Sequence, residues 1–496
     1  MGKKDQWAVA LPVLLHLAIV IPLAATLNAW IDEVHTMNTV RGSLAHTLDR
    51  AIGFEMQPPL YFILMNLWAR LGSSLFFLRL FSVACTGASV WLASRISKSL
   101  FREPHHGWLA LAVAVNPYTI WAATEARLYA FLVLLTAALL ATFVRGFLSE
   151  APSARSSRRW FFAISVLALY TQYYAAFLLA AFFLALLVMR RWAAARTLAG
   201  WLALAGVGAM PLILSAFDQI AGHRQFIVVG NDLLNYLSVG TRFLRYPLRL
   251  EWMPPALYML VYAACVAGLL ALAARQRRHL NEGFILAGSV IVAVTAFFLA
   301  AMQLVNHELV NTTHTAVLFL PALLLPAAAL SVLPSEWRKA GAVVFLSVMI
   351  AANGVHMAGE YAPMAKFGDS RRVADHIAAN EAPGQPILVF IAELALPLEY
   401  HYSGSNRIVP IPDKVPDACD DVSSFALRSV QDITGALQRE GLRPECLWVV
   451  NWGLCRYLGV DYHCEILEEF IREGYIVEDD RRFFHSRVRR LRRKVG

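Results

Sequence analysis

Charged side chains are scarce in this sequence. Only 16% of its 496 residues are Asp, Glu, Lys or Arg, whereas about a quarter are charged in an average soluble domain. Hydrophobic residues make up 58% of the chain, and the mean hydropathy is +0.52. This composition excludes an ordinary soluble protein and indicates a membrane protein with several spans.

Other absences narrow the interpretation further. The net charge of +9 is divided among short basic clusters between apolar runs, so no nucleic-acid partner is expected. The six cysteines contain no C-x₂-C pair, which argues against a zinc site. The first apolar run has no convincing small-residue cleavage site after it, so it is predicted to stay as a span rather than to leave as a signal peptide. Internal repeats and low-complexity segments are also missing.

Long apolar runs predict about eleven transmembrane helices. They cover roughly residues 7–29, 76–94, 107–123, 126–144, 160–172, 173–189, 197–217, 254–274, 283–303, 315–333 and 340–357. With this count, every short Lys/Arg cluster falls on one side, which the positive-inside rule makes cytoplasmic. We therefore expect a multi-pass protein of the cytoplasmic (inner) membrane, in contact with membrane lipids.

Two segments are difficult to place in this topology. Residues 160–189 are read as two short helices, because Thr171 to Tyr174 form a polar midpoint. Residues 60–69 are apolar enough to span, but a span there would reverse the charge pattern of everything downstream. We therefore predict two interfacial helices, 34–50 and 59–71, on the outer face.

The chain changes character near residue 360. We expect residues 1–360 to form the membrane domain, with a first outer loop at 30–75, and residues 361–496 to form an extracytoplasmic α/β domain. Short apolar runs at 386–391 and 447–450 predict strands, and 369–380 and 424–440 predict helices. The four cysteines in this domain are expected to form two disulfides, with the pairing left open: Cys419, Cys446, Cys455 and Cys464. The basic end, 487–494, is expected to be a solvated or headgroup-facing tail.

Several charged residues stand out on the predicted outer side. Asp32 and Glu33 directly follow the first span, and Glu125, Arg127 and Arg79 lie in or beside short outer turns that otherwise lack charge. Simpler interpretations are helix termination by the two acids, a surface ion pair between Glu125 and Arg127, and a snorkelling Arg79. Cations placed against the positive-inside trend nevertheless suggest an anionic ligand, such as a lipid-linked phosphate. The 218–253 loop adds further arginines, while histidines 307 and 314 are weak candidates.

Taken in order, these stretches resemble a known family. Asp32-Glu33, residues 57–62 from Gln57, Leu78 to Leu80, Asn116-Pro117, Glu125 to Tyr129 and Tyr170 to Tyr174 look like the pattern of glycosyltransferase family 39. That family of GT-C membrane glycosyltransferases includes protein O-mannosyltransferases and bacterial aminoarabinose lipid A transferases. The resemblance covers roughly residues 25–175. Gln57 and Gln172 depart from it, because the family often has histidine at both positions.

The resemblance implies a function. Such enzymes transfer a sugar from a polyprenyl phosphate to an acceptor hydroxyl of a lipid, glycan or protein on the extracytoplasmic face, with inversion. Asp32 is then the catalytic base, and Arg79 and Arg127 stabilise the departing phosphate. Glu33 and Glu125 would position the acceptor, orient an arginine or hold a divalent cation (Mg, Mn or Ca). Gln57, Tyr61 and Tyr129 complete the expected substrate-binding set.

Two other functions fit part of the pattern. A membrane transporter also has many spans and intramembrane charge, but it should show paired hydropathy halves and broken helices near the midplane. A polysaccharide polymerase or ligase of another fold would depend on arginines in a large outer loop, which the 218–253 loop could supply.

Overall fold

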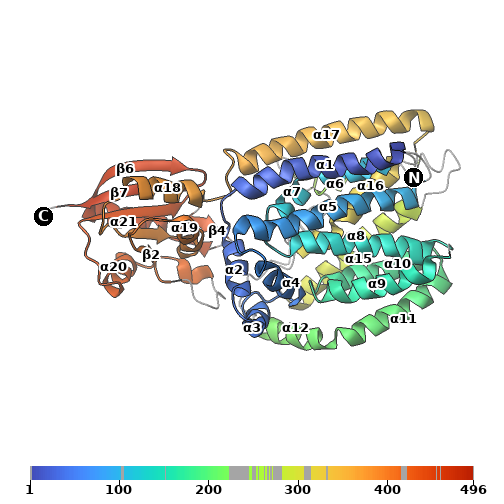
Figure 1. Cartoon of the computed structure of the whole chain (residues 1–496), viewed down its shortest axis with the longest axis horizontal. Helices are drawn as coiled ribbons and strands as arrows, with labels where there is room; N and C mark the ends of the chain where they lie inside the picture. Colours follow the sequence, from blue (N-terminus) through green and yellow to red (C-terminus); the bar gives the residue numbers. More distant parts are fainter. Residues whose placement is uncertain are drawn as a thin grey trace. The chain divides into compact units, whose positions relative to one another are not determined.

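The computed structural model in Figure 1 describes residues 3–101, 106–150, 152–222, 245–247, 253–254, 282–305, 314–330, 333–414, 422–453, 455–457 and 460–494, with scattered positions between 256 and 271. The chain divides into two compact units. The helical unit contains residues 1–25, 42–224 and 228–358, and the mixed unit contains 26–41, 225–227 and 359–496.

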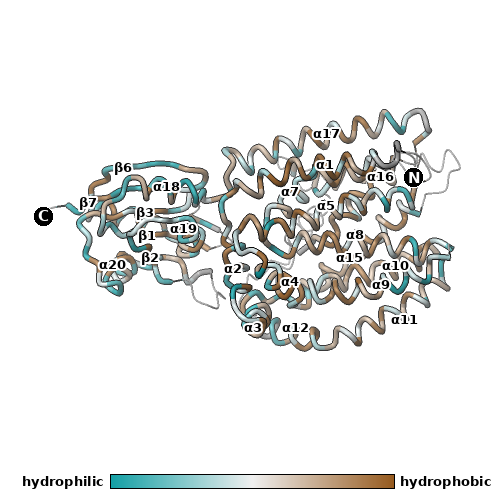
Figure 2. Tube along the Cα trace, viewed as in Figure 1, coloured by the Kyte–Doolittle hydropathy of each residue, from teal (hydrophilic) through white to brown (hydrophobic). Residues whose placement is uncertain are grey.

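The helical unit is built from apolar helices (Figure 2). Its described helices are α1 (Lys3–Thr26), α3 (Leu44–Gly53), α4 (Leu60–Ala69), α5 (Leu75–Leu100), α6 (His106–Ala114), α7 (Pro117–Ala123), α8 (Tyr129–Phe143), α9 (Ala154–Leu169), α10 (Ala175–Val188), α11 (Trp192–Gly208), α12 (Met210–Gly222), α15 (Glu282–Val305), α16 (Phe319–Leu330) and α17 (Ser335–Tyr361). Within the described residues, five helices are long and apolar enough to cross a membrane, or six if the bent pair α11–α12 is one span. The chain is therefore a multi-pass membrane protein.

Two breaks between helices fall where the sequence is polar or contains proline. The 107–123 segment is divided into α6 and α7, because Pro117 begins a new helix and Asn116 caps it, with its side-chain oxygen accepting from the Tyr118 N–H. Residues 160–189 form two helices, α9 and α10, as expected from the polar midpoint. The total of eleven spans remains a prediction, because most of 254–274 lies outside the described residues.

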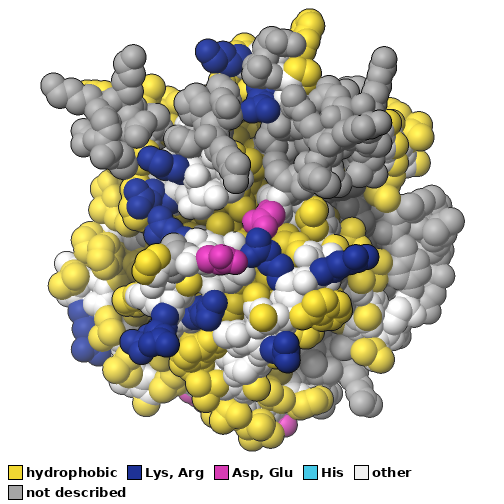
Figure 3. Space-filling model, turned by 90° about the vertical axis from the view of Figure 1, so that its right-hand side faces the viewer, with side chains coloured by type: hydrophobic (Ala, Val, Ile, Leu, Met, Phe, Trp, Pro, Cys, Tyr) yellow, Lys and Arg dark blue, Asp and Glu magenta, His cyan; other side chains and the backbone are white. Residues whose placement is uncertain are grey.

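Lys and Arg side chains gather at one end of the helical unit, the end where α1 begins (Figure 3). Hydrogen bonds join the connecting loops there: Arg158 donates to the Gly146 carbonyl at 2.7 Å and Arg191 to the Leu148 carbonyl at 2.8 Å. Arg191 also pairs with Glu282 at the start of α15. This clustering of basic residues is what the topology in the sequence predicts, and the candidate residues of this unit belong to the loops and helix ends at its other end.

The first outer segment differs from its prediction. Instead of one helix over 34–50 there are two, α2 (Ile31–Val40) and α3, and they belong to different units. The break falls at Gly42 and Ser43. The Ser43 side chain caps α3 by accepting from the His46 N–H at 3.2 Å. A Cβ on Gly42 would lie 2.5 Å from the His46 ring, so a side chain does not fit there. The second predicted helix, 59–71, is present as α4.

The mixed unit contains a five-stranded sheet in the order β2-β1-β3-β7-β6. Its strands are β1 (Ile387–Phe390), β2 (Ile408–Pro410), β3 (Cys446–Trp452), β6 (Tyr475–Phe483) and β7 (Ser486–Arg493). β1 pairs in parallel with both β2 and β3, whereas β7 is antiparallel to β3 and to β6. The helices of this unit include α18 (Ser370–Asn380), α19 (Ala395–His401), α20 (Val430–Arg439) and α21 (Cys464–Gly474). The predicted strands are present as β1 and β3, and the predicted helix 369–380 is present as α18. The predicted helix 424–440 is shorter, because α20 begins only at Val430.

The basic C-terminal run is a strand and not the solvated tail that its composition suggests. β7 lies inside the sheet, with Val488 and Leu491 fully buried. Acids on neighbouring elements neutralise its arginines: Arg487 pairs with Asp480 at 2.5 Å, and Arg489 pairs with Glu468 at 2.7 Å. The prediction was wrong because these acids are distant or unremarkable in the sequence and become partners only in the sheet.

The cysteines also differ from their prediction. Cys455 and Cys464 form a disulfide that joins the hairpin of β4 (Arg456–Tyr457) and β5 (Val460–Asp461) to the start of α21. Cys446 carries a free thiol, so the expectation that it is disulfide-bonded is wrong. It begins β3 and pairs in register with Arg492, a position without a neighbouring cysteine in the described sheet. Cys419 lies outside the described residues.

Candidate active site

A buried ion pair lies at the outer-loop end of the helical unit. Arg127, between α7 and α8, donates to Glu55, between α3 and α4, at 2.6 Å. The two side chains are only 11% and 3% exposed. Removing one partner of such a pair would leave an uncompensated buried charge. The sequence suggested Glu125 as the partner of Arg127, and Glu55 was missed because it is one acid in a polar stretch with no further signal.

Arg79 is buried in the same unit. It lies in the first turns of α5 at 1% exposure and donates to the carbonyl oxygen of Ala24 at 2.9 Å. Ala24 belongs to the last turn of α1, where carbonyl groups lack partners within the helix and attract cations.

Glu125 is 3% exposed, and its carbonyl oxygen accepts from the Ser82 hydroxyl at 2.6 Å. This bond fixes the 124–128 turn against α5, one helical turn after Arg79. The backbone carrying Arg127 is therefore held by Ser82, while its side chain is held by Glu55. Tyr129, which begins α8, is 8% exposed and stacks on Trp121 with ring centroids 5.0 Å apart.

Gln57 and Gln172, the two departures from the family pattern, lie on segments that the fold joins. The Leu60 N–H donates to the Tyr170 carbonyl at 3.0 Å, which ties the start of α4 to the turn between α9 and α10. Gln57 Oε1 and Gln172 Nε2 are both buried and have no hydrogen-bond partner among the described residues. A buried polar atom without a partner costs free energy. These two amides are therefore candidates for binding a polar ligand. Tyr61, in the first turn of α4, is fully buried against Phe62 and Phe81.

Part of the 218–253 loop is also anchored in the helical unit. Tyr246 is 7% exposed; its carbonyl accepts from the Asn116 amide at 2.8 Å, and its hydroxyl lies 2.6 Å from that of Thr315. The Tyr118 ring packs edge-on against it. Arg245 is held next to this anchor. The loop's other arginines, 224, 242 and 249, and the candidate histidine 307 lie outside the described residues.

Asp32 and Glu33 belong to the mixed unit, in the first turn of α2. Glu33 is fully buried, and its Oε2 accepts from Lys366 Nζ at 2.8 Å and from the Trp30 N–H at 3.1 Å. The second bond caps the start of the helix. Asp32 is half-buried. The two neighbouring acids thus have different environments, and Glu33 has a structural partner that the sequence did not reveal.

The pairing of Glu33 with Lys366 decides whether Glu33 can bind the expected divalent cation. The ammonium group at 2.8 Å and the helix-capping bond occupy the Glu33 carboxylate, and a positively charged neighbour disfavours a metal ion. Glu33 therefore does not fit a cation. Glu125 is an oxygen ligand of the type that Mg²⁺ and Ca²⁺ prefer, and it stays a candidate.

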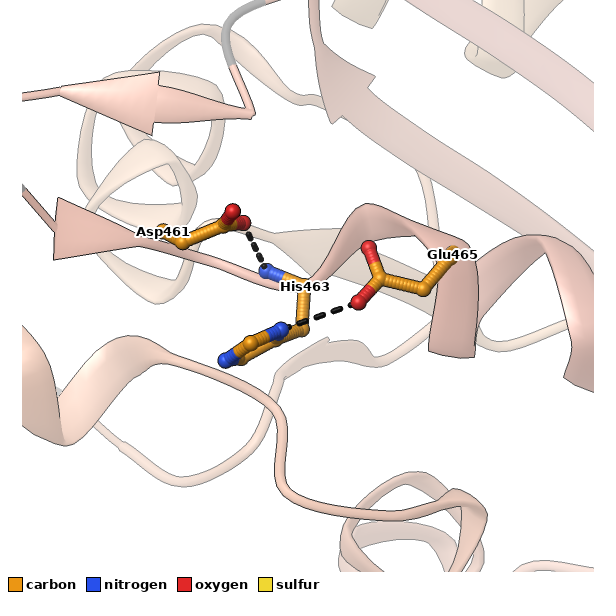
Figure 4. Close-up of side chains that lie close together, drawn as sticks. All are labelled: Asp461, His463 and Glu465. Carbon is orange, nitrogen blue, oxygen red and sulfur yellow. Dashed lines mark hydrogen bonds and ion pairs between the residues drawn. The ribbon is translucent and has the colours of Figure 1, made fainter.

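A different cluster has metal-ligating side chains. Asp461, His463 and Glu465, in the mixed unit, place one ligand atom each within 4.8 Å of one another (Figure 4). The His463 N–H and Arg456 donate to Asp461, which lowers the pKa of this carboxyl. Hydrogen bonds from its own backbone and from His463 lower the pKa of Glu465. The cluster is largely exposed, and its charges already have partners within the protein.

Comparison with known proteins bears on the fold. No family model matches the sequence, and no curated protein matches it. The structure is similar to the oligosaccharyltransferase of Archaeoglobus fulgidus in the apo form, with a TM-score of 0.50 and 11% identity over 95% of this chain and 73% of that one. The chain has a GT-C fold. The resemblance that the sequence predicted is confirmed at this level. ArnT from Cupriavidus metallidurans, bound to undecaprenyl phosphate, is also similar, with a TM-score of 0.45 and 14% identity over 97% of both chains.

Proposed function

We propose that this chain is an inverting glycosyltransferase that takes a sugar from a polyprenyl phosphate. The acceptor is a hydroxyl on the extracytoplasmic face of the inner membrane, and the chain is a relative of glycosyltransferase family 39. The GT-C fold supports this proposal, together with the ordered motifs between residues 25 and 175. The observation that carries it is the pair of arginines Arg79 and Arg127, which are 1% and 11% exposed. Arg79 bonds the last turn of α1, whereas the basic clusters lie at the end where α1 begins (Figure 3).

The cations suit a reaction in which a phosphate leaves. As the bond between the anomeric carbon and the phosphate oxygen breaks, the electron pair stays on the phosphate and negative charge develops there. A buried guanidinium stabilises that charge more strongly than an exposed one, because little water screens it. Arg127 can keep its bond to Glu55 and still offer further donors, and Glu55 would hold it in place before the donor binds.

Asp32 is the proposed base. It would take the proton of the acceptor hydroxyl while the oxygen attacks the anomeric carbon on the face opposite the phosphate, which inverts that centre. A carboxylate can perform this step when its oxygen lies within hydrogen-bond reach of the proton. Asp32 is favoured over Glu33, since Glu33 is fully buried and paired with Lys366.

The substrate-binding residues follow from the same hypothesis. Gln57 and Gln172 would bind sugar hydroxyls with the amide atoms that lack partners in the described chain. Tyr61 and Tyr129 would line the donor site, and Glu125 would orient Arg127 or position the acceptor. A divalent cation would screen the phosphate and would require Glu125 rather than Glu33. None of the proposed reaction steps requires a divalent cation.

Mass spectrometry of lipids and glycans from wild-type and deletion cells tests the proposal. The deletion should remove one glycan modification and leave a polyprenyl-phosphate sugar to accumulate. Complementation with the Asp32→Asn chain should not restore the modification. Identical profiles in the two strains would contradict the proposal. Accumulation of a substrate free of lipid on one side of the membrane would favour transport, and loss of polymer length without loss of a modification would favour a polymerase or ligase.

A further inference from the structure

The mixed unit has a sheet edge at which related architectures commonly bind ligands. In sheets with parallel strands, ligands bind in the crevice beyond the carboxyl ends of those strands. Here β1, β2 and β3 run parallel and end at Phe390, Pro410 and Trp452. We call this the carboxyl edge, and in this unit it is covered by the chain itself.

Aromatic side chains fill the carboxyl edge. The Trp452 ring is stacked parallel to the Trp30 ring, with centroids 6.0 Å apart, and Phe367 packs edge-on against both rings. His485, in the turn between β6 and β7, stacks on Phe367 at 4.4 Å. Trp30 directly precedes α2, and Ile31 joins the hydrophobic core of the mixed unit at 6% exposure. A segment from the start of the chain thus packs against the end of β3 and the core of the mixed unit.

Polar contacts fix the same segment, residues 26–41. The Lys366 N–H donates to Asn28 Oδ1 at 2.7 Å, the Ala29 N–H donates to His401 Nε2 at 2.9 Å, and Arg371 donates to the Thr26 carbonyl at 2.9 Å. The buried Lys366–Glu33 pair adds a charged bond between residues 333 apart in sequence.

From these contacts we infer that the mixed unit positions Asp32 for the transfer reaction, with Lys366 as the main positioning residue. This inference rests on the proposed function for the role of Asp32. Ile31 and Glu33 on either side are buried in the mixed unit, while Asp32 between them is half-buried. Neighbouring residues of a helix point about 100° apart, so anchoring these two sets the direction of Asp32. Lys366 is a positioning residue and not a catalytic one, because it acts through Glu33.

Hydrogen–deuterium exchange of the full-length chain tests the docking without any assay of activity. Lys366→Met leaves the Glu33 carboxylate buried without its partner, a strongly destabilising change. The peptide covering 26–41 should then exchange about 10- to 100-fold faster, while α5 exchanges as in the wild type. The double variant Glu33→Gln/Lys366→Met removes both charges of this pair, and the increase should be smaller. The control is Lys414→Met, since the Lys414 side chain is 71% exposed.

Transfer kinetics test the positioning. Lys366→Met should lower kcat by about 10- to 100-fold, because small displacements of a reacting group have effects of this size, with KM for the donor unchanged. Lys366→Arg should recover most of the rate, and Lys414→Met should keep all of it. If Lys366→Met fails to fold, His401→Phe removes the bond to Ala29 and keeps an aromatic ring at this position. It should raise exchange of 26–41 and lower kcat by about threefold or more.

The outcomes separate the two proposals. Unchanged exchange of 26–41 in Lys366→Met overturns the inference. Faster exchange with an unchanged kcat also overturns it, because docking would then not position the base. If the wild-type chain transfers no sugar, the proposed function fails, and exchange alone decides whether the docking is real.

Discussion

The helical and mixed units both bury charge, but they use it differently. In the mixed unit, Glu33–Lys366 joins two segments far apart in sequence and completes a helix cap. In the helical unit, Glu55 holds Arg127 between two loops, and Arg79 meets a helix-end carbonyl. A guanidinium has five donors in a planar fork that can bind two anions side by side, whereas an ammonium is a compact point charge with three donors. The partner of a charged residue, more than its place in the sequence, therefore indicates its role.

The largest effect is expected at Asp32. Asp32→Asn keeps the shape of the side chain and removes its basic oxygen, so transfer should fall by about 10²- to 10⁴-fold. Expression and thermal stability should stay close to those of the wild type, since Asp32 is only half-buried. Initial rates of the purified variant, measured beside its melting curve, check this. A variant with wild-type rates would remove Asp32 from the mechanism.

The next effect concerns Arg127 in the helical unit. Arg127→Ala should slow transfer by about 10²- to 10³-fold, as for removal of a donor to a developing anion. Lys should rescue only in part, because it lacks the fork that bonds Glu55 and phosphate together. Glu55→Gln keeps a hydrogen-bond acceptor and should slow transfer less. Equal, normal turnover in all three variants would make the pair purely structural, like its counterpart in the mixed unit.

Replacing Glu33 should lower stability more than it lowers transfer, the reverse of the result expected for Asp32. Glu33→Gln leaves the Lys366 ammonium buried without its carboxylate and should destabilise the mixed unit by about 3 kcal/mol. The midpoint of its denaturant unfolding should therefore fall. Any loss of transfer should be smaller than for Asp32→Asn when both are corrected for the folded fraction. If Glu33→Gln unfolds like the wild type but no longer transfers sugar, Glu33 would be the base and Asp32 would not.

A smaller effect is expected from the disulfide. Replacing Cys455 and Cys464 by serine should lower the stability of the mixed unit by about 2 kcal/mol, because the bond closes a short loop. The helical unit should not respond. Mass mapping without reduction should find this link and a free Cys446. A disulfide at Cys446 would contradict the structure.

The smallest effect is a dependence on pH. The bond from Arg487 lowers the pKa of Asp480 below its ordinary value of 3.8. A lowered folded-state pKa means that the pair stabilises the mixed unit above that value, and that this contribution is lost as the pH falls through the folded-state pKa. Because the pair is partly exposed, the effect should be small. Asp480→Asn should remove it, which melting curves from about pH 5 down to about pH 2 would show as a weaker acid response.

The sequence predicted what depends on local pattern. Apolar run length gave the long helices, and breakers such as Pro117 marked their interruptions. Short continuous apolar runs predicted β1 and β3. It failed where distant residues decide the outcome: β7 is a strand because it pairs with β3 and β6, and 26–41 joins the mixed unit through contacts such as Glu33–Lys366. Glu55 was missed as the partner of Arg127 for the same reason, because nothing local distinguishes it from other loop acids.

Turnover by the purified chain in lipid vesicles tests the central claim most directly. Supplied with polyprenyl-phosphate sugars and an acceptor extract, the wild-type chain should release polyprenyl phosphate and form a glycosylated product of inverted anomeric configuration. Asp32→Asn should release almost none. A wild-type chain that consumes no lipid-linked sugar, or equal release of polyprenyl phosphate by both chains, would contradict a glycosyltransferase with Asp32 as its base.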